Sequence, residues 1–241
     1  MHDVAEALDA LTLARQTFGR VSFDLIYARQ DQSLNQWKGE LERALSMGPD
    51  HLSLYQLTIE PGTAFGARAE AGKLAGLPGD ALAVEMYALT QEMCDTAGLE
   101  MYEVSNHAKK GQESRHNLIY WQSGDWLGIG PGAHGRLTLD GTRITTMAPS
   151  NPREWLSAPL VMARETLPLE EQAEEALIMG LRLRWGIDLP AYEARYGVTL
   201  NRTRLTDLIS LSLVELDHGN LRLTPDGWPL LNTILLELSR D

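Results

Sequence analysis

The sequence has almost no cysteine, and this absence excludes several kinds of chemistry. Only one of its 241 residues is a cysteine, Cys94. A single thiol excludes a disulfide within the chain, and a zinc or iron–sulfur site whose ligands are mainly the chain's own thiolates. No Gly-x-Ser-x-Gly motif is present either, and no base neighbours Cys94. We therefore expect Cys94 to be a small buried apolar residue rather than a nucleophile.

Positive charge and long apolar runs are also scarce. Lysine and arginine number 21 against 33 aspartates and glutamates, which gives a net charge of −12 and a pI of about 4.9. Without a basic block, neither a nucleic acid nor an anionic membrane surface is an expected partner. No apolar run reaches membrane-spanning length, and the N-terminus does not resemble a signal peptide. The sequence predicts a cytoplasmic protein with one large domain or two smaller ones.

The first hundred residues alternate between strand and helix patterns. Residues 21–27 read as a strand with Val21, Phe23, Leu25 and Tyr27 on one face and Asp24 on the other. Residues 33–47 read as an amphipathic helix with a Ser33/Gln36 capping box, and 51–59 as a second strand, buried on both faces. Two strands joined by a helix predict a parallel βαβ unit. A helix over 80–97 and a strand over 100–105 should follow.

A composition change near 148–152 predicts a domain boundary, with one domain at 1–148 and another at 149–241. The second domain should contain helices over 170–185 and about 202–213, a hairpin turning at 218–220, and a last helix after Thr224-Pro225. This order resembles a winged-helix module. Acidic residues outnumber basic ones there, so we do not expect it to bind DNA.

The stretch 102–136 has the most unusual composition. It is too polar for a core strand and too rich in glycine for a helix, so we interpret it as a loop-built site. Trp121 and Trp126 are by default packing residues, although a flat aromatic pair beside histidines would also suit a planar macrocycle. The polar and glycine residues of this stretch are His107, His116, Asn117, Tyr120, Asp125 and His134, with glycines at 128, 130, 132 and 135.

Simpler interpretations compete with each functional one. Asp24, inside a strand, would either bond a neighbouring backbone group or point into a barrel lumen, where it could accept hydrogen bonds from ribose hydroxyls or an amino group; Gln56 supports the same argument more weakly. The glycine spacing is not Gly-x-Gly-x-x-Gly, and no His-x-x-x-His spacing exists, so neither a Rossmann loop nor a zinc site is predicted. The four glycines would let the backbone approach a ligand or another strand closely.

Four segments together resemble the HemW-type haem chaperones, which are radical S-adenosylmethionine (SAM) relatives of the oxygen-independent coproporphyrinogen III oxidases. The match extends over almost the whole chain in the family's order. The segments are Asp-Leu-Ile-Tyr at 24–27, the run from Gly-Pro-Asp-His to Glu-Pro-Gly-Thr at 48–63, His-Asn-Leu-Ile-Tyr-Trp at 116–121, and Gly-Ile-Gly-Pro-Gly-Ala-His-Gly at 128–135.

The resemblance implies an α/β fold: the C-terminal part of an incomplete (β/α)6 radical SAM barrel, followed by a small winged-helix-like α+β domain. Members of the family hold a [4Fe–4S] cluster on a Cys-x-x-x-Cys-x-x-Cys loop, and SAM binds the cluster. This chain has no such loop, so we interpret it as truncated at the N-terminus and expect it to lack cluster-dependent SAM cleavage. An unpaired edge of the strand near 21–28 should favour oligomers.

The resemblance also implies roles for individual residues. Asp24, Thr58 and His134 match SAM-contacting positions, and His116, Asn117 and Tyr120 match the His-Asn-x-x-Tyr motif associated with haem, in which His116 is the expected iron ligand. The implied function is haem delivery to respiratory proteins, with transient membrane-protein contact. Two alternatives remain: a fragment of a coproporphyrinogen III oxidase, and an interaction module without cofactors. His116 as a simple loop-capping residue is the structural alternative.

The sequence departs from the family pattern at two places. The family usually follows Asp-Leu-Ile-Tyr with a Pro-Gly pair, whereas residues 28–33 here are Ala-Arg-Gln-Asp-Gln-Ser. A glycine expected in the winged-helix region is also replaced around 210–212. Because proline is rigid and glycine permissive, we expect altered local geometry at both places.

Overall fold

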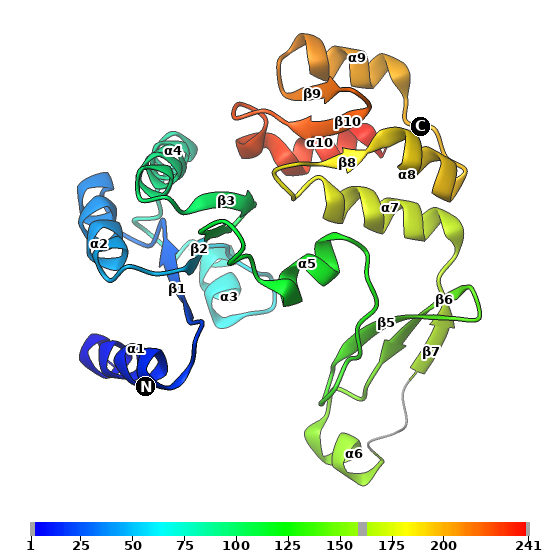
Figure 1. Ribbon diagram of the computed structural model, residues 1–241. Helices are drawn as coiled ribbons and strands as arrows, with labels where there is room; N and C mark the ends of the chain where they lie inside the picture. Colours follow the sequence, from blue (N-terminus) through cyan, green and yellow to red (C-terminus); the bar gives the residue numbers. More distant parts are fainter. Residues whose placement is uncertain (1–2, 159–162, 240–241) are drawn as a thin grey trace. The chain divides into compact units, whose positions relative to one another are not determined.

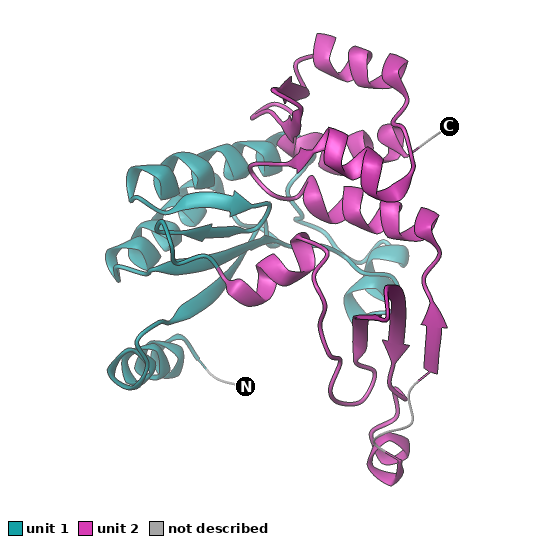
Figure 2. Cartoon of the chain, turned by 45° about the vertical axis from the view of Figure 1, so that its right-hand side comes forward, with its two compact units in different colours: residues 1–113 teal, residues 114–241 magenta. Residues whose placement is uncertain are grey.

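The computed structural model describes residues 3–158 and 163–239. The chain divides into two compact units, Met1–Glu113 and Ser114–Asp241 (Figure 2). The boundary predicted from composition at 148/149 differs from this division and lies inside the second unit. The reason is strand pairing, because β6 (Thr142–Met147), before that point, pairs with β7 (Ala163–Thr166), after it.

The first unit is built on a four-stranded sheet with the order β1-β2-β4-β3 (Figure 1). β1 and β2 pair in parallel with Asp24 opposite Ser53, and the helix α2 connects them, which confirms the predicted βαβ unit. β2 and β3 each pair antiparallel with the short strand β4. The elements of this sheet and its helices are β1 (Ser22–Tyr27), α2 (Leu34–Ser46), β2 (His51–Gln56), α4 (Asp80–Thr96), β3 (Glu100–Glu103) and β4 (Asn106–Ala108).

The core of this unit lies between one face of the sheet and the helices α2 and α4. Trp37 is completely buried, stacks on Tyr27 with 5.0 Å between ring centroids, and donates its indole N–H to Thr90 at 2.9 Å. An indole can be buried at low cost only when its N–H is paired in this way. Cys94 is also buried here, as predicted, and burial first, with the negative charge of Asp95 second, raises its pKa to about 12.

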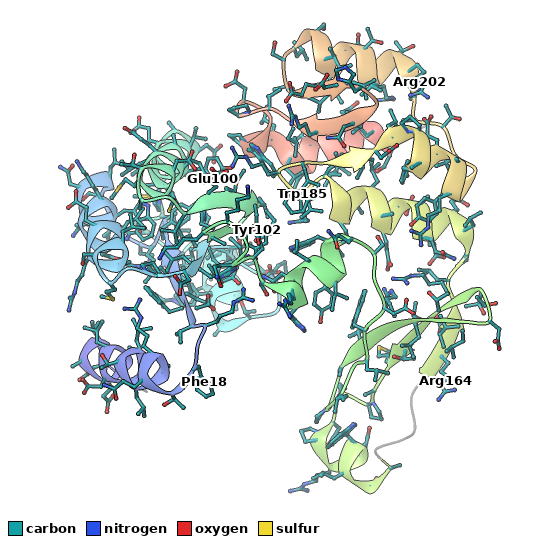
Figure 3. All side chains as sticks on the ribbon, in the orientation of Figure 1. Phe18, Glu100, Tyr102, Arg164, Trp185 and Arg202 are labelled. Carbon is teal, nitrogen blue, oxygen red and sulfur yellow. The ribbon has the colours of Figure 1, made fainter. Side chains whose placement is uncertain are left out.

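Several predicted bounds of the first unit were wrong. β2 ends at Gln56 rather than at 59, and only its first four residues are buried. Its neighbour β4 pairs with residues 51–53 alone. Residues 54–56 of β2 therefore pair with β1 but not with β4. The helix α3 (Ala64–Glu70), capped by Thr63, was not predicted. α1 (Val4–Thr17) begins with an Asp3 capping box but buries no residue, and Phe18 after it is 65% exposed (Figure 3).

The second unit begins with a short helix and an antiparallel sheet. α5 (Arg115–Trp121) precedes β5 (His134–Leu139), which pairs with β6, and β6 pairs with β7. The prediction that this region is all loop was therefore wrong at both ends. A serine cap at Ser114 starts α5, and Gly128, Gly130 and Gly132 precede β5, whereas Gly135 is its second residue. The helix α6 (Pro152–Ser157) follows β6.

The rest of the chain contains the two predicted helices and the hairpin, with one further helix between the two, and a three-stranded sheet β8-β10-β9. The hairpin turns at His218 and Gly219, both with positive φ. The helix predicted over 170–185 ends at Gly180, where a side chain would collide with Ile187 of β8. The elements are α7 (Leu169–Gly180), β8 (Ile187–Asp188), α8 (Leu189–Tyr196), α9 (Arg202–Ser210), β9 (Val214–Asp217), β10 (Asn220–Leu223), η1 (Trp228–Leu230) and α10 (Leu231–Leu238).

Helix α8 was not predicted, and the last helix begins later than expected. Thr224 accepts the Gly227 amide N–H at 3.1 Å and so organises a turn before η1, rather than capping α10 directly. Within the described residues, no helix combines the length and the apolar character that crossing a membrane requires.

Candidate functional site

His116 and Tyr120 meet on one side of α5. The helix begins after Ser114, whose hydroxyl accepts the Asn117 backbone N–H at 3.3 Å. Residues four apart on a helix lie on the same face, so His116 and Tyr120 are neighbours. Their rings make an edge contact with 4.9 Å between centroids, and the Tyr120 hydroxyl lies 3.2 Å from His116 Nε2, within hydrogen-bond distance. His116 is exposed, whereas Asn117 and Tyr120 are partly buried.

Trp126 extends this contact into a row of rings. Tyr120 meets Trp126 at 4.6 Å between centroids in an edge-on arrangement. The Trp126 indole N–H donates to the His134 backbone carbonyl at 3.2 Å, so Trp126 connects α5 to the first residue of β5. Two of the four residues predicted in this unit for haem or SAM, Tyr120 and His134, thus contact this indole, and His116 contacts Tyr120. We call His116, Tyr120 and Trp126 the aromatic row.

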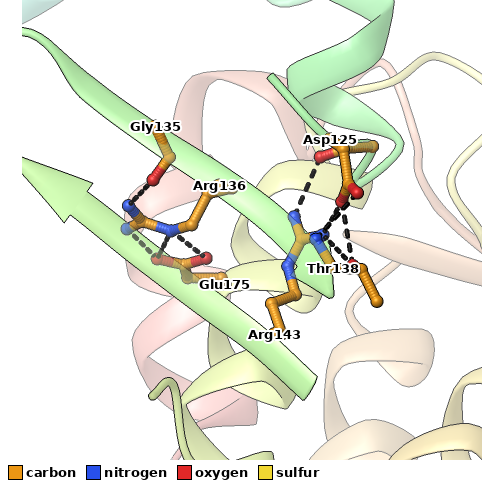
Figure 4. Close-up of polar contacts among 7 residues, drawn as sticks. Asp125, Gly135, Arg136, Thr138, Arg143 and Glu175 are labelled. Carbon is orange, nitrogen blue, oxygen red and sulfur yellow. Dashed lines mark hydrogen bonds and ion pairs between the residues drawn. The ribbon is translucent and has the colours of Figure 1, made fainter. Parts of the chain in front are cut away.

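Two arginines hold Trp126 in place. The guanidinium carbons of Arg136 and Arg143 lie 5.7 and 6.0 Å from the centre of its ring, within the range of cation–π attraction. Arg136 forms a two-pronged pair with Glu175 of α7 and donates to the Gly135 carbonyl (Figure 4). Paired guanidinium groups are less free to move, so the indole they flank keeps one orientation.

The other arginine, Arg143, has partners of its own. The side chain of Arg143 is only 8% exposed and donates to Asp125 at 2.7 Å and to the Gly124 carbonyl at 2.9 Å (Figure 4). Partial desolvation acts to raise the pKa of Asp125, but hydrogen bonds from Thr138 and the charge of Arg143 outweigh it and hold that pKa below its ordinary value. The carboxylate therefore stays charged and keeps Arg143 in place.

Sequence reasoning singled out Asp125 and Trp126 but missed Arg136, Arg143 and Glu175. Arginines at alternate positions of two paired strands were the available signal, since Arg136 and Arg143 lie on the same face of β5 and β6. Trp121 and Trp126 do not act as one flat pair, because Trp121 faces Arg182 at 5.7 Å while Trp126 contacts Tyr120.

The glycines next to the site are needed for backbone approach. A side chain at Gly128 would overlap the His134 carbonyl, and one at Gly135 would lie 2.5 Å from Thr146 Oγ1 and 3.0 Å from the Gly128 amide. These two glycines let the segment before β5 lie against it, with Trp126 and Arg136 exchanging backbone hydrogen bonds. Of the two predicted uses of the glycines, approach of a second strand accounts for Gly128 and Gly135.

Known proteins resemble this chain across both of its units. Residues 167–230 match the family model described as HemN C-terminal domain. The chain is 37% identical to mouse "Radical S-adenosyl methionine domain-containing protein 1, mitochondrial" over 98% of its length, and 36% identical to "Heme chaperone HemW" of Escherichia coli over 98%. It is 31% identical to "Heme chaperone HemW" of Bacillus subtilis over 97%. These matches cover 57%, 62% and 63% of the relatives.

A solved structure shares the fold. The sequence predicted a resemblance to coproporphyrinogen III oxidases. The structure of "Coproporphyrinogen III oxidase (HemN) from Escherichia coli", a radical SAM enzyme, superposes on this chain with a TM-score of 0.76. This match covers 99% of the present chain and 59% of that chain at 18% identity. The chain is thus similar, over nearly its whole length, to HemN-like radical SAM proteins. The predicted fold class, part of a radical SAM barrel followed by a C-terminal domain, is confirmed.

In this HemN-like chain the residues predicted to contact SAM are divided between the two units. Asp24 lies in the middle of β1 on its exposed face, and Thr58 lies two residues beyond the end of β2, with its hydroxyl 3.4 Å from the Gln56 carbonyl. His134 belongs to the second unit, at the start of β5, where it is exposed. Asp24 thus lies on the face of β1 opposite Phe23, Leu25 and Tyr27, as the alternation of the strand predicted.

A chain of three polar side chains, not predicted from the sequence, lies on the same sheet face as Asp24. His51 of β2 contacts the Ser22 hydroxyl at 2.6 Å and the Tyr102 hydroxyl at 2.8 Å. Burial lowers the pKa of His51; the charges of Asp24 and Glu113 oppose this, and that of Arg20 adds to it. The neutral imidazole therefore links β1 to β3 across the sheet. Nothing in the local sequence pattern distinguishes His51 from other strand residues.

The thiol of this chain does not fit an iron–sulfur cluster. Cys94 is the sole cysteine, is fully buried on α4, and has a pKa raised to about 12 by burial, whereas cluster ligands are thiolates. The loop that replaces the family's Pro-Gly pair contains two non-glycine residues with positive φ, Ala28 at 56° and Asp31 at 57°. Both residues thus adopt the left-handed conformation that non-glycine residues rarely take.

Proposed function

We propose that this chain is the haem-binding part of a haem chaperone, and that haem binds at His116, Asn117 and Tyr120. The observation that supports the site is the direct contact of His116 with Tyr120, held from behind by Trp126. Imidazole and phenol are both known side-chain ligands of haem iron. In the complete protein this site would receive haem and pass it to haem-accepting respiratory proteins, including membrane proteins contacted transiently.

The donor set fits a macrocycle better than a bare metal ion. Haem supplies four nitrogens of its own, so one or two protein ligands suffice. Within residues 3–158 and 163–239, no three His, Cys, Asp or Glu side chains gather to hold a metal ion by themselves. The segment after Trp126 also exposes apolar surface, with Leu127 69% and Ile129 80% exposed. An apolar surface beside a single ligand is what a planar porphyrin would bind.

The alternatives have weaker support. The relatives named as haem chaperones are 30–36% identical to this chain, whereas the coproporphyrinogen oxidase structure is 18% identical and supports the fold alone. An interaction module without cofactors would not need the ordered His116–Tyr120 contact. SAM contacts by Asp24, Thr58 and His134 stay predictions from family resemblance, and so does the cytoplasmic location, since the mouse relative is named as mitochondrial.

Titration of the chain with ferric haem tests the site. We expect a shifted Soret band with the native chain, and a loss of affinity of about tenfold or more for His116→Ala, because a coordinated iron ligand or its direct partner is removed. His218→Ala is the matched control, since that imidazole is 95% exposed in a hairpin turn. Equal affinity of the native chain and His116→Ala, with a loss in His218→Ala, would refute the site.

A further inference from the structure

Arg182 differs from the other cationic side chains of this protein. It follows the end of α7 and is partly buried. Across residues 3–158 and 163–239, every other arginine that is partly or fully buried pairs with a carboxylate, whereas the Arg182 side chain has neither an ion pair nor a hydrogen bond to an acceptor. A guanidinium that loses water without gaining an acceptor is unfavourable, so this position suits an anionic ligand.

The contact of Arg182 is with the last residue of α5. Its guanidinium carbon lies 5.7 Å from the centre of the Trp121 ring, within the range of cation–π attraction. The Trp121 indole N–H is buried and also has no acceptor among the described residues. Two side chains that can only donate hydrogen bonds thus meet here, and neither has an acceptor. This corner of the second unit lacks an oxygen ligand.

The two arginines that hold the aromatic row are already occupied. Arg136 pairs with Glu175, and Arg143 pairs with Asp125. A second carboxylate would have to displace the first from either guanidinium. Arg182 has no such competitor, and its ring contact already directs it toward α5.

Haem carries two propionate carboxylates, which are acceptors of the kind that this corner lacks. We propose that Arg182 binds a propionate of the haem held at His116 and Tyr120; this inference rests on the proposed function. The N–H groups of a guanidinium match the two oxygens of a carboxylate in pairs. Trp121, which follows Tyr120 in the chain, orients the guanidinium before haem arrives, so less conformational entropy is lost on binding. Arg182 would thereby select porphyrins that have a free carboxylate.

Esterification of haem tests this assignment without changing the protein. Haem dimethyl ester keeps the ring and the iron but has no free carboxylate. In the same detergent buffer, the native chain should bind the ester about tenfold more weakly than haem, as measured by the change in the Soret band. Equal affinity for the two would overturn the assignment, and it is also the result expected if the guanidinium takes a free carboxylate from solution.

Variants of Arg182 connect the loss to this side chain. Arg182→Gln should lower the affinity for haem about tenfold and leave the affinity for the ester unchanged, because the ester has no charge to pair. Arg182→Lys keeps the charge but not the paired N–H groups, so its affinity for haem should be intermediate. Arg195→Gln is the matched control, since Arg195 of the same unit is exposed and its guanidinium lies 5.2 Å from the centre of the Tyr196 ring.

The possible failures can be told apart. An Arg182→Gln chain that is folded by circular dichroism and binds haem as the native chain does would overturn the assignment, and so would an equal loss for haem and the ester, since packing alone would explain it. If His116→Ala still weakens haem binding in those cases, the proposed haem site stands. A native chain that binds neither haem nor the ester would overturn the proposed function and this inference together.

Discussion

His107 illustrates how a single side chain links folding to pH. It is 1% exposed, with Nε2 3.2 Å from the Gln91 amide oxygen and with no partner for Nδ1 among the described residues. Desolvation, with a smaller contribution from His51, lowers its pKa to about 4. A charged imidazole in this core would lack water and a counter-charge, so His107 stays neutral in the folded state. This histidine, predicted as part of a loop-built site, is instead a core residue of β4.

The first prediction concerns acid stability. Since the folded pKa of His107 lies below its unfolded value, its contribution to stability is fully present above about pH 6.5 and is lost as the pH falls toward 4. The shift corresponds to a loss of about 3 kcal/mol. Urea unfolding of the first unit between pH 7.5 and 4.5 should show this slope, and His107→Gln should flatten it. A further flattening is expected when His51→Gln is added. An unchanged slope in His107→Gln would show that other groups control acid unfolding.

At the scale of elements, the end of α9 shows the effect of a missing glycine. The helix ends at Ser210, Leu211 is its C-cap, and Ser212 follows with φ at 57°. This is the left-handed position where glycine is preferred after a helix, because a Cβ there crowds the backbone. The glycine that the family resemblance implies around 210–212 would suit this left-handed position.

We therefore predict that Ser212→Gly stabilises the chain by about 1 kcal/mol, since it relieves the left-handed strain. Ser210→Gly is the matched control, because Ser210 is an exposed serine two residues earlier but inside the helix. That variant should be destabilised by about 0.5–1 kcal/mol. Thermal unfolding of both variants measures the two effects, and equal shifts of the same sign would contradict the argument.

At the scale of the whole molecule, the first sheet has a free edge at β1 among the described residues. β1 pairs with β2 alone among the described strands, and it has an exposed apolar side chain, Ile26, at 46%. An open edge with apolar residues is a template for pairing with another strand. Oligomerisation of this chain stays a prediction, which this edge supports.

Ile26→Lys should reduce self-association of the chain, because a lysine on an edge strand opposes pairing with a second copy. Val84→Lys is the matched control: Val84 is also 46% exposed, but it lies on the helix α4, whose backbone groups are already paired. Light scattering over a range of protein concentrations compares the two. A native chain that stays monomeric, or an equal effect of both lysines, would show that the β1 edge does not drive association.

The structural features that the sequence determined by itself are local ones or ones that follow a periodic residue pattern. The alternation of β1 placed Asp24 on the face opposite Phe23 and Leu25, the Ser33/Gln36 capping box started α2, and the motif at 116–120 gave the candidate site. Each depends on residues within a few positions of one another, where side-chain spacing and backbone geometry are directly coupled. The family order of the motifs then supported the barrel and the C-terminal domain.

What only the tertiary structure decided involves residues distant in the sequence. The pairing of Arg136 with Glu175, the short β4 that limits pairing along β2, and the contact of Trp126 with both Tyr120 and His134 all depend on how chain segments meet. No local pattern specifies such meetings, because they depend on the packing of whole elements. For the same reason the sequence located His116 and Tyr120, but only the folded chain showed that the Tyr120 hydroxyl lies within hydrogen-bond distance of His116 Nε2.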